Sequence, residues 1–135
     1  ASKKARGLGA KAIPLAVSAP FHCALMEPAA KKLKKDLEKI DFKTPNLPVY
    51  TNVTGEKATN SFEIKEALLK QVTQPVLWQI DIENMISDGA LFFVEVGPGK
   101  SLAGFGRRTN PNVRFASFCR PEDLDAVTDL YKGDV

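Results

Sequence analysis

The chain has 135 residues, of which 44% are hydrophobic and 26% are charged, and its formal net charge is only +3. This is the size and composition of one globular domain with a sizeable core. Its longest apolar runs, such as Leu91–Val94, fall far short of the roughly 18 residues of a membrane span. The composition therefore excludes a membrane-spanning helix, and the weak charge gives no support for nucleic-acid binding.

The N-terminal part of the sequence predicts a helix end, a strand and a second helix. Residues 1–6 are typical of the last turns of a helix, with Gly7 or Gly9 as its stop. Because no helix start precedes them, we expect the chain to be a fragment. The apolar residues 12–17 predict a buried strand. Apolar side chains then recur at helical spacing from Met26 to Ile40, with Pro28 in the first turn.

The rest of the sequence predicts strands and helices in alternation. The predicted strands are residues 49–53, 91–96 and 113–118. The predicted helices begin after Asn60, at Pro75, at Lys100 and at Pro121. Asn60 and Glu63 form a capping box for the first of these helices, and Asp88-Gly89 ends the second. Apolar strands that alternate with helices indicate an α/β fold with a largely parallel sheet.

His22, the only histidine, is the first candidate for chemistry. It follows a predicted buried strand, where α/β enzymes build their sites, and histidine in general titrates near neutral pH. A single histidine is more often structural, so the pattern alone leaves both interpretations open. Cys23 and Ser18 carry nucleophilic atoms but lie in no recognisable elbow. One histidine and two distant cysteines, Cys23 and Cys119, are too few ligands for a metal site.

Residues 95–101 are a second candidate, because a strand, a glycine turn and a helix start follow one another there. Helix N-termini attract phosphate, but the Walker pattern needs glycine where Val94 stands. Leu102 likewise breaks the dinucleotide fingerprint. We therefore expect a structural turn.

A third candidate is the segment from Gln71 to Trp78, where a helix ends before Pro75 and leaves carbonyls free to accept a proton from an imidazole. No serine of the chain has glycines two positions to either side, so the elbow of an α/β acyltransferase is missing. The chain by itself contains no complete catalytic apparatus.

Four separated motifs cover nearly the whole chain: VSAPFHCALM at residues 17–26, TNVTG at 51–55, Gln71 with QPVLW at 74–78, and EVGPGK at 95–100 with Leu102. In this order and spacing they resemble the malonyl-CoA:acyl-carrier-protein transacylases of fatty acid synthesis. The match corresponds to somewhat less than the second half of such an enzyme.

The resemblance implies an α/β-hydrolase-like acyltransferase core with an inserted ferredoxin-like small subdomain. Residues 1–20 would be the end of the small subdomain, including its last strand. Residues 21–135 would be the C-terminal part of the large subdomain.

In this family a serine attacks the malonyl thioester of coenzyme A, a histidine accepts its proton, and the seryl ester passes malonyl to the phosphopantetheine thiol of acyl carrier protein. His22 matches the histidine, and Gln71 matches the residue whose main-chain carbonyl orients it, so that its side chain should matter less than its backbone. Phe21 matches a position that shapes the acyl pocket, where phenylalanine goes with malonyl selection. Lys11 matches a basic position implicated in docking the acidic carrier.

The serine, the arginine that holds the malonyl carboxylate and a glutamine of the oxyanion site have no counterpart in the chain. We therefore expect the chain alone to be inactive. Its partners would be acyl carrier protein, malonyl-CoA and the missing N-terminal part of the enzyme, with no nucleic acid and no membrane. No bound cofactor is implied, since the coenzyme A thioester is a substrate.

Two reduced cysteines without an export signal predict a cytoplasmic protein, or an organellar one in a eukaryote. Two alternatives to an acyltransferase stay open. One is a non-catalytic α/β module that holds a phosphate or nucleotide at the glycine turn. The other is a non-catalytic protein that binds acyl carrier protein through its lysines.

Overall fold

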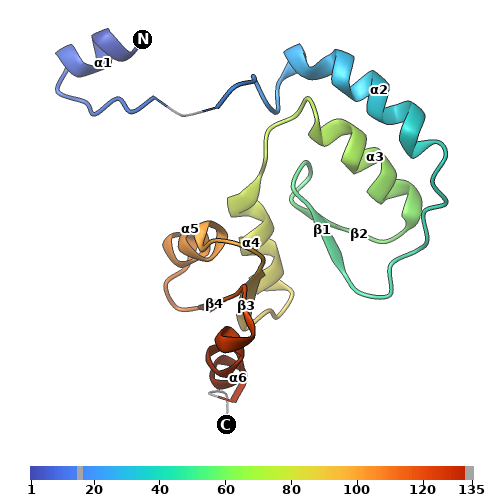
Figure 1. The fold of residues 1–135 in the computed structure, drawn as a ribbon, viewed down its shortest axis with the longest axis vertical. Helices are drawn as coiled ribbons and strands as arrows, with labels where there is room; N and C mark the ends of the chain where they lie inside the picture. Colours follow the sequence, from blue (N-terminus) through green and yellow to red (C-terminus); the bar gives the residue numbers. More distant parts are fainter. Residues whose placement is uncertain (15–16, 133–135) are drawn as a thin grey trace.

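The computed structural model describes residues 1–14 and 17–132. The first elements are α1 (Ser2–Gly7), the 3₁₀ turn η1 (Ala24–Met26), α2 (Glu27–Leu37), β1 (Val49–Thr51), β2 (Glu56–Ala58) and α3 (Ser61–Gln71). The later ones are α4 (Trp78–Ser87), β3 (Phe92–Val96), α5 (Ser101–Thr109), β4 (Arg114–Phe118), η2 (Pro121–Asp123) and α6 (Leu124–Lys132). Figure 1 shows α2, α3 and the β1–β2 hairpin on one side of α4, and the β3–β4 sheet with α5 and α6 on the other.

The helix starts follow the predicted caps. Pro28 occupies the first turn of α2, where its missing N–H leaves no hydrogen bond unmade. At α3 the side chain of Asn60 accepts a hydrogen bond from the Glu63 N–H at 2.9 Å. The Glu63 carboxylate completes the cap on Thr59 instead of Asn60, accepting from the Thr59 N–H at 2.6 Å. The predicted helix at Pro75 begins three residues later, at Trp78.

The described strands form two separate two-stranded sheets. β3 and β4 are parallel, with Phe92 opposite Arg114 and α5 as the crossover between them. β1 and β2 are antiparallel, with Thr51 opposite Glu56. The α/β class is therefore confirmed, but the prediction of a largely parallel sheet is wrong for the hairpin. Its turn ends at Gly55, whose φ of 75° lets the chain reverse, and the short polar β2 carries no apolar alternation that could have predicted it.

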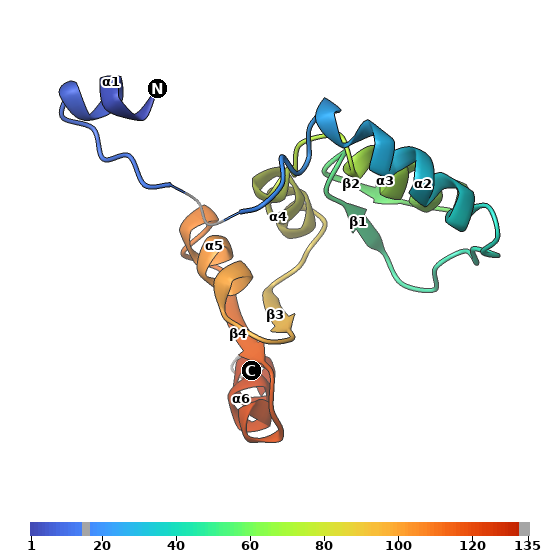
Figure 2. The ribbon, with the colours of Figure 1, turned by 45° about the horizontal axis from the view of Figure 1, so that its top comes forward.

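The strand predicted over residues 12–17 is not formed by residues 12–14 or 17, and residues 15–16 lie outside the described part of the chain. The side chains of Ile13 and Val17 are 69% and 62% exposed. A strand needs a neighbour to pair with its N–H and C=O groups, and no described strand lies beside this segment. The predicted helix α1 is present, but it contacts no other described helix or strand and stands apart in Figures 1 and 2.

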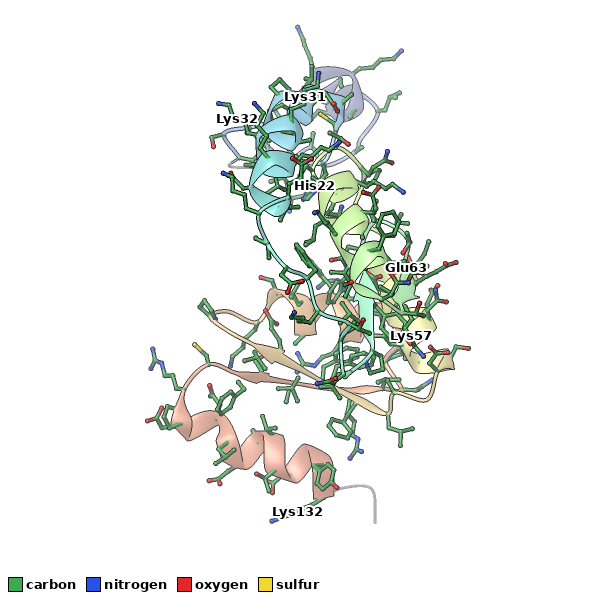
Figure 3. All side chains as sticks on the ribbon, turned by 90° about the vertical axis from the view of Figure 1, so that its right-hand side faces the viewer. His22, Lys31, Lys32, Lys57, Glu63 and Lys132 are labelled. Carbon is green, nitrogen blue, oxygen red and sulfur yellow. The ribbon has the colours of Figure 1, made fainter. Side chains whose placement is uncertain are left out.

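The apolar core lies in the C-terminal half. Ile82, Ala103 and Phe115 are buried, and the rings of Phe93 and Phe115 stack with their centroids 4.9 Å apart. A Cβ added at Gly106 would overlap the Phe115 ring, so glycine lets α5 approach β4 closely. α5 and α6 both pack on the β3–β4 sheet, and α6 lies below it in Figure 3. Among the described residues no helix combines the length and apolar character that crossing a bilayer requires.

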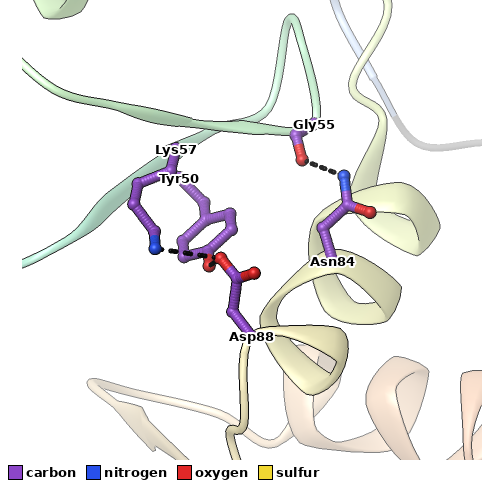
Figure 4. A network of polar contacts seen from close by, with 5 residues as sticks. All are labelled: Tyr50, Gly55, Lys57, Asn84 and Asp88. Carbon is purple, nitrogen blue, oxygen red and sulfur yellow. Dashed lines mark hydrogen bonds and ion pairs between the residues drawn. The ribbon is translucent and has the colours of Figure 1, made fainter.

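Polar side chains hold the hairpin against α4, as Figure 4 shows. The Tyr50 hydroxyl donates to the Asp88 carboxylate, and the Lys57 ammonium lies 3.0 Å from the same carboxylate. The Asn84 amide donates to the Gly55 carbonyl at 2.7 Å. Hydrogen bonds are directional, so these contacts fix the orientation of the hairpin on the helix.

Candidate functional site

His22 has an unusual main chain. It is the only non-glycine residue with a positive φ in the described part of the chain, at 56°. For residues other than glycine this conformation costs about 1–3 kcal/mol, and it persists only where neighbouring contacts hold it. The Cys23 thiol donates to the Pro20 carbonyl at 3.1 Å and so closes the turn around His22. Backbone strain of this kind is commonest at functional sites.

The imidazole of His22 contacts the end of α3. Its Nδ1 lies 2.8 Å from the main-chain oxygen of Gln71, a residue 49 positions further along the chain. Gln71 is the last residue of α3, so its carbonyl has no partner within the helix. Figure 3 shows His22 beside this end of α3, with Glu63 near the other.

The contact selects one tautomer of the ring. A carbonyl oxygen can only accept, so Nδ1 must carry the proton and donate it to Gln71. In the neutral ring Nε2 then keeps its lone pair and can accept a proton from another molecule. The pair can therefore act chemically as an oriented general base.

The side chain of Gln71 has its own contacts. Its amide donates to the carbonyls of Gln74 and Pro75, at 3.0 and 3.2 Å. These bonds shape the turn that follows α3 and so steady the carbonyl that faces His22. Local sequence patterns carry no signal for them, because they depend on the path of the chain after the helix.

The structure joins His22 and Gln71 but does not bring all four predicted site residues together. Phe21 adjoins His22 in sequence and its side chain is 56% exposed. Lys11 is exposed and follows α1, and no hydrogen bond or ion pair of the described residues joins it to His22. The roles predicted for Phe21 and Lys11 stay predictions.

At the glycine turn over residues 97–99, N–H groups that could have bound a phosphate donate to acceptors of the chain itself. The carboxylate of Glu95 accepts the Ala103 N–H at 2.8 Å, inside the first turn of α5. The Gly97 N–H donates to the Phe118 carbonyl at 3.0 Å. A carboxylate at a helix N-terminus takes the place that a phosphate would need and repels a second anion. Sequence reasoning missed this role of Glu95, although an acidic residue just before a glycine turn and a helix is a usable signal.

Curated proteins and solved structures are similar to this chain over most of its length. No family model matches the sequence. Over 99% of its residues the chain is 40% identical to the malonyl CoA-acyl carrier protein transacylase of Bacillus subtilis, of which it spans 43%. It is 47% identical over 90% of its residues to the transacylase of the same name from Haemophilus influenzae, of which it spans 39%.

Solved structures agree. The malonyl CoA-acyl carrier protein transacylase of Clostridium perfringens matches 97% of this chain with a TM-score of 0.88 and 40% identity, and 42% of that chain is covered. A malonyl-transacylase in complex with a type II polyketide acyl-carrier protein matches 97% of this chain with a TM-score of 0.86 and 37% identity, over 42% of its own length.

In sequence and fold the chain is similar to acyltransferases with an α/β structure. More narrowly, it is homologous to part of the malonyl CoA-acyl carrier protein transacylases, which confirms the resemblance predicted from its four motifs. It spans less than half the length of the curated relatives that it matches.

Proposed function

We propose that this chain is the part of a malonyl transferase that supplies the general base. The complete enzyme would move a malonyl group from coenzyme A to the phosphopantetheine thiol of acyl carrier protein through a seryl ester. The observation that carries the proposal is the hydrogen bond from His22 Nδ1 to the Gln71 carbonyl, which leaves Nε2 free as a base. The nucleophilic serine would come from the part of the enzyme outside this chain.

The proton balance follows from this geometry. As the serine Oγ attacks the thioester carbon, its proton passes to His22 Nε2, and the departing thiolate of coenzyme A then takes that proton. In the second half the pantetheine thiol gives its proton to Nε2 and attacks the seryl ester, and the proton returns to the serine. Nδ1 keeps its proton throughout and holds the ring against the Gln71 carbonyl.

We also propose the finer architecture implied by the family. Residues 1–20 would belong to a ferredoxin-like small subdomain, and residues 21–135 to the large α/β-hydrolase-like subdomain. The lack of any contact between α1 and other described elements supports this, because such a helix needs another part of the protein to pack on. Phe21 would line the acyl pocket, and Lys11 would help to dock the acidic carrier.

Large apolar side chains before and after the histidine in sequence support a missing partner segment. Ile13, Val17, Phe21 and Leu25 are each more than half exposed. Exposed apolar side chains that cluster along one stretch are typical of a surface that is covered in the complete molecule. We propose that the N-terminal part of the enzyme covers them.

The test is His22→Ala in the intact enzyme that contains this chain. General-base contributions are typically about 10²- to 10⁴-fold, so we expect malonyl transfer to fall by that factor. Cys119→Ala is the control, because this exposed cysteine follows β4, away from the His22 turn, and surface substitutions of this kind should change transfer by less than about 2-fold. Near-normal transfer by the His22 variant would refute the proposal.

The intact enzyme and its His22→Ala variant also distinguish the proposed function from the two alternatives. A phosphate-binding module would bind phosphate or a nucleotide regardless of His22, although the Glu95 carboxylate at the α5 N-terminus counts against it. A non-catalytic carrier-binding protein would bind acyl carrier protein in a salt-sensitive way and transfer no malonyl group even when the rest of the enzyme is supplied.

A further inference from the structure

Asp81 is a carboxylate in an unexpected place. It lies on α4 with its side chain 1% exposed, and it is the only buried charged residue in the described part of the chain. Burial raises its pKa, and a hydrogen bond from the Asn52 amide to one carboxylate oxygen opposes that rise only in part. The other oxygen, Oδ1, has no partner among the described residues.

A buried carboxylate of this kind is not expected to be there for stability. Burying a carboxylate costs free energy unless its hydrogen bonds are complete, and an apolar side chain of similar volume is often as good or better. Among the described residues the Asp81 carboxylate has a single hydrogen-bond partner, Asn52. Its presence is therefore better explained by what it holds in place than by stability.

Asn52 connects Asp81 to the segment that follows α3. While its side chain donates to Asp81, its own main-chain carbonyl accepts the Leu77 N–H at 2.7 Å. Asn52 lies in the hairpin turn and Leu77 immediately precedes α4, so this pair fixes the C-terminal end of the segment 72–77.

Gln71 fixes the other end of the same segment. Its side-chain amide donates to the carbonyls of Gln74 and Pro75, while its main-chain carbonyl accepts from His22. Gln71 and Asn52 also line one small cavity of about 150 Å³ between the hairpin and α3. Hydrogen bonds thus lead from Asp81 through Asn52 to Leu77, the main chain leads on to Pro75, and further hydrogen bonds join Pro75 to Gln71 and Gln71 to the imidazole.

We propose that Asp81 is a positioning residue: through Asn52 and Leu77 it fixes the segment 72–77 and so aims the Gln71 carbonyl at His22 Nδ1. Its effect on catalysis rests on the function proposed above, whereas its effect on the imidazole can be measured without any reaction. Asp81 touches no substrate in this scheme and acts only through the histidine.

The test follows His22 by ¹⁵N NMR in the intact enzyme, where His22→Ala identifies its signals. The shifts of the two imidazole nitrogens report which of them carries the proton. In the unmodified chain we expect Nδ1 to be protonated. Asp81→Leu removes the acceptor for Asn52 and should change the tautomer ratio of His22 by about 2- to 10-fold, as expected for one neutral hydrogen bond.

Asp81→Asn is the conservative variant, because its amide oxygen still accepts from Asn52. It should keep the unmodified tautomer ratio. Asp88→Asn is the matched control on the same side of the hairpin: Asp88 also holds the hairpin, but through Tyr50 and Lys57, and its loss should leave the His22 signals unchanged. An unchanged tautomer ratio in folded Asp81→Leu would overturn the proposal, as would equal changes in all three variants.

A reversed pair covers the case in which Asp81→Leu does not fold. In Asn52→Asp with Asp81→Asn the donor and acceptor exchange places and the link is kept, so the tautomer ratio should be that of the unmodified chain. A changed tautomer ratio in the folded double variant would contradict the proposed link between Asn52 and Asp81. In the intact enzyme Asp81→Leu should lower kcat with little change in KM. If His22→Ala leaves transfer intact, the function fails while the NMR result still decides the role of Asp81.

Discussion

The two small sheets of this chain are held in place by different forces. The β3–β4 sheet is held by apolar packing. Phe115 belongs to the buried cluster, and α5 approaches its ring closely at Gly106. The β1–β2 hairpin is fixed to α4 by polar contacts of Asn52, Tyr50 and Lys57. Apolar packing supplies most of the free energy of folding, whereas hydrogen bonds add little net free energy but set orientation.

The candidate site depends on the part of the chain that polar contacts hold in place: the β1–β2 hairpin and the segment between α3 and α4, here called the polar region. The carbonyl that orients His22 belongs to the segment between α3 and α4, which is held by hydrogen bonds of Asn52 and Gln71. Damage to the β3–β4 sheet should therefore unfold the chain, whereas loss of the side-chain hydrogen bonds of Asn52 or Gln71 should loosen the site in a chain that remains folded. The contrast between the two regions can be tested directly.

The largest effect is expected from truncating the core of the β3–β4 sheet. Phe115 is 8% exposed, and replacing a buried phenylalanine by alanine typically costs about 3–5 kcal/mol of unfolding free energy. This is a large share of the total of about 5–15 kcal/mol usual for a domain. Urea unfolding of Phe115→Ala measures the loss. Phe62→Ala, at a side chain that is 71% exposed, is the control and should change little.

Overpacking the same region should have a smaller effect. In Gly106→Ala the new methyl group would overlap the Phe115 ring, and such strain costs about 1–3 kcal/mol. Gly104→Ala lies on the same helix with open space around its Cβ, so helix propensity should stabilise it by up to about 1 kcal/mol. Opposite signs in thermal unfolding are expected. Equal shifts would show that α5 does not pack on β4 as described.

The smallest effect is expected from the exposed end of the polar region. Hydrogen bonds from Tyr50 and Lys57 hold the pKa of Asp88 below its ordinary value of 3.8. The stability that Asp88 contributes is therefore complete above pH 3.8 and is lost as the pH falls through its lowered pKa. Asp88→Asn should reduce stability slightly at neutral pH and not at all in strong acid.

Urea unfolding at several pH values measures this difference between Asp88→Asn and the unmodified chain. Molar salt should shrink the difference at neutral pH, because it screens the exposed pair of Lys57 and Asp88. The Phe115→Ala loss should not respond to salt in this way. A difference that grows on acidification would contradict the sign derived for Asp88.

Much of the secondary structure was predictable from local signals. Pro28, Asn60 and Asp88-Gly89 mark helix ends through backbone geometry that each residue imposes on its own neighbourhood. The strands at 92–96 and 114–118 follow from short apolar runs bounded by turns. The family likewise followed from motifs that lie along the sequence.

The predictions failed where a second segment decides the outcome. Residues 12–14 and 17 are as apolar as a strand should be, yet they form none because no described strand pairs with them. The β2 strand is polar and short, and it forms because the Gly55 turn folds it back on β1. Strand formation depends on a partner, which apolar character cannot report.

The order of residues alone was enough to indicate the family, most helix boundaries and His22 as the residue to watch. The family resemblance also pointed to the Gln71 carbonyl as its partner. The fold alone shows how the two meet: across 49 residues, with His22 in a left-handed backbone conformation and a buried Asp81 behind the loop that presents the carbonyl. The reason is physical. Caps and periodicity act within a few residues, whereas a hydrogen bond between distant segments exists only when the whole fold brings its two ends together.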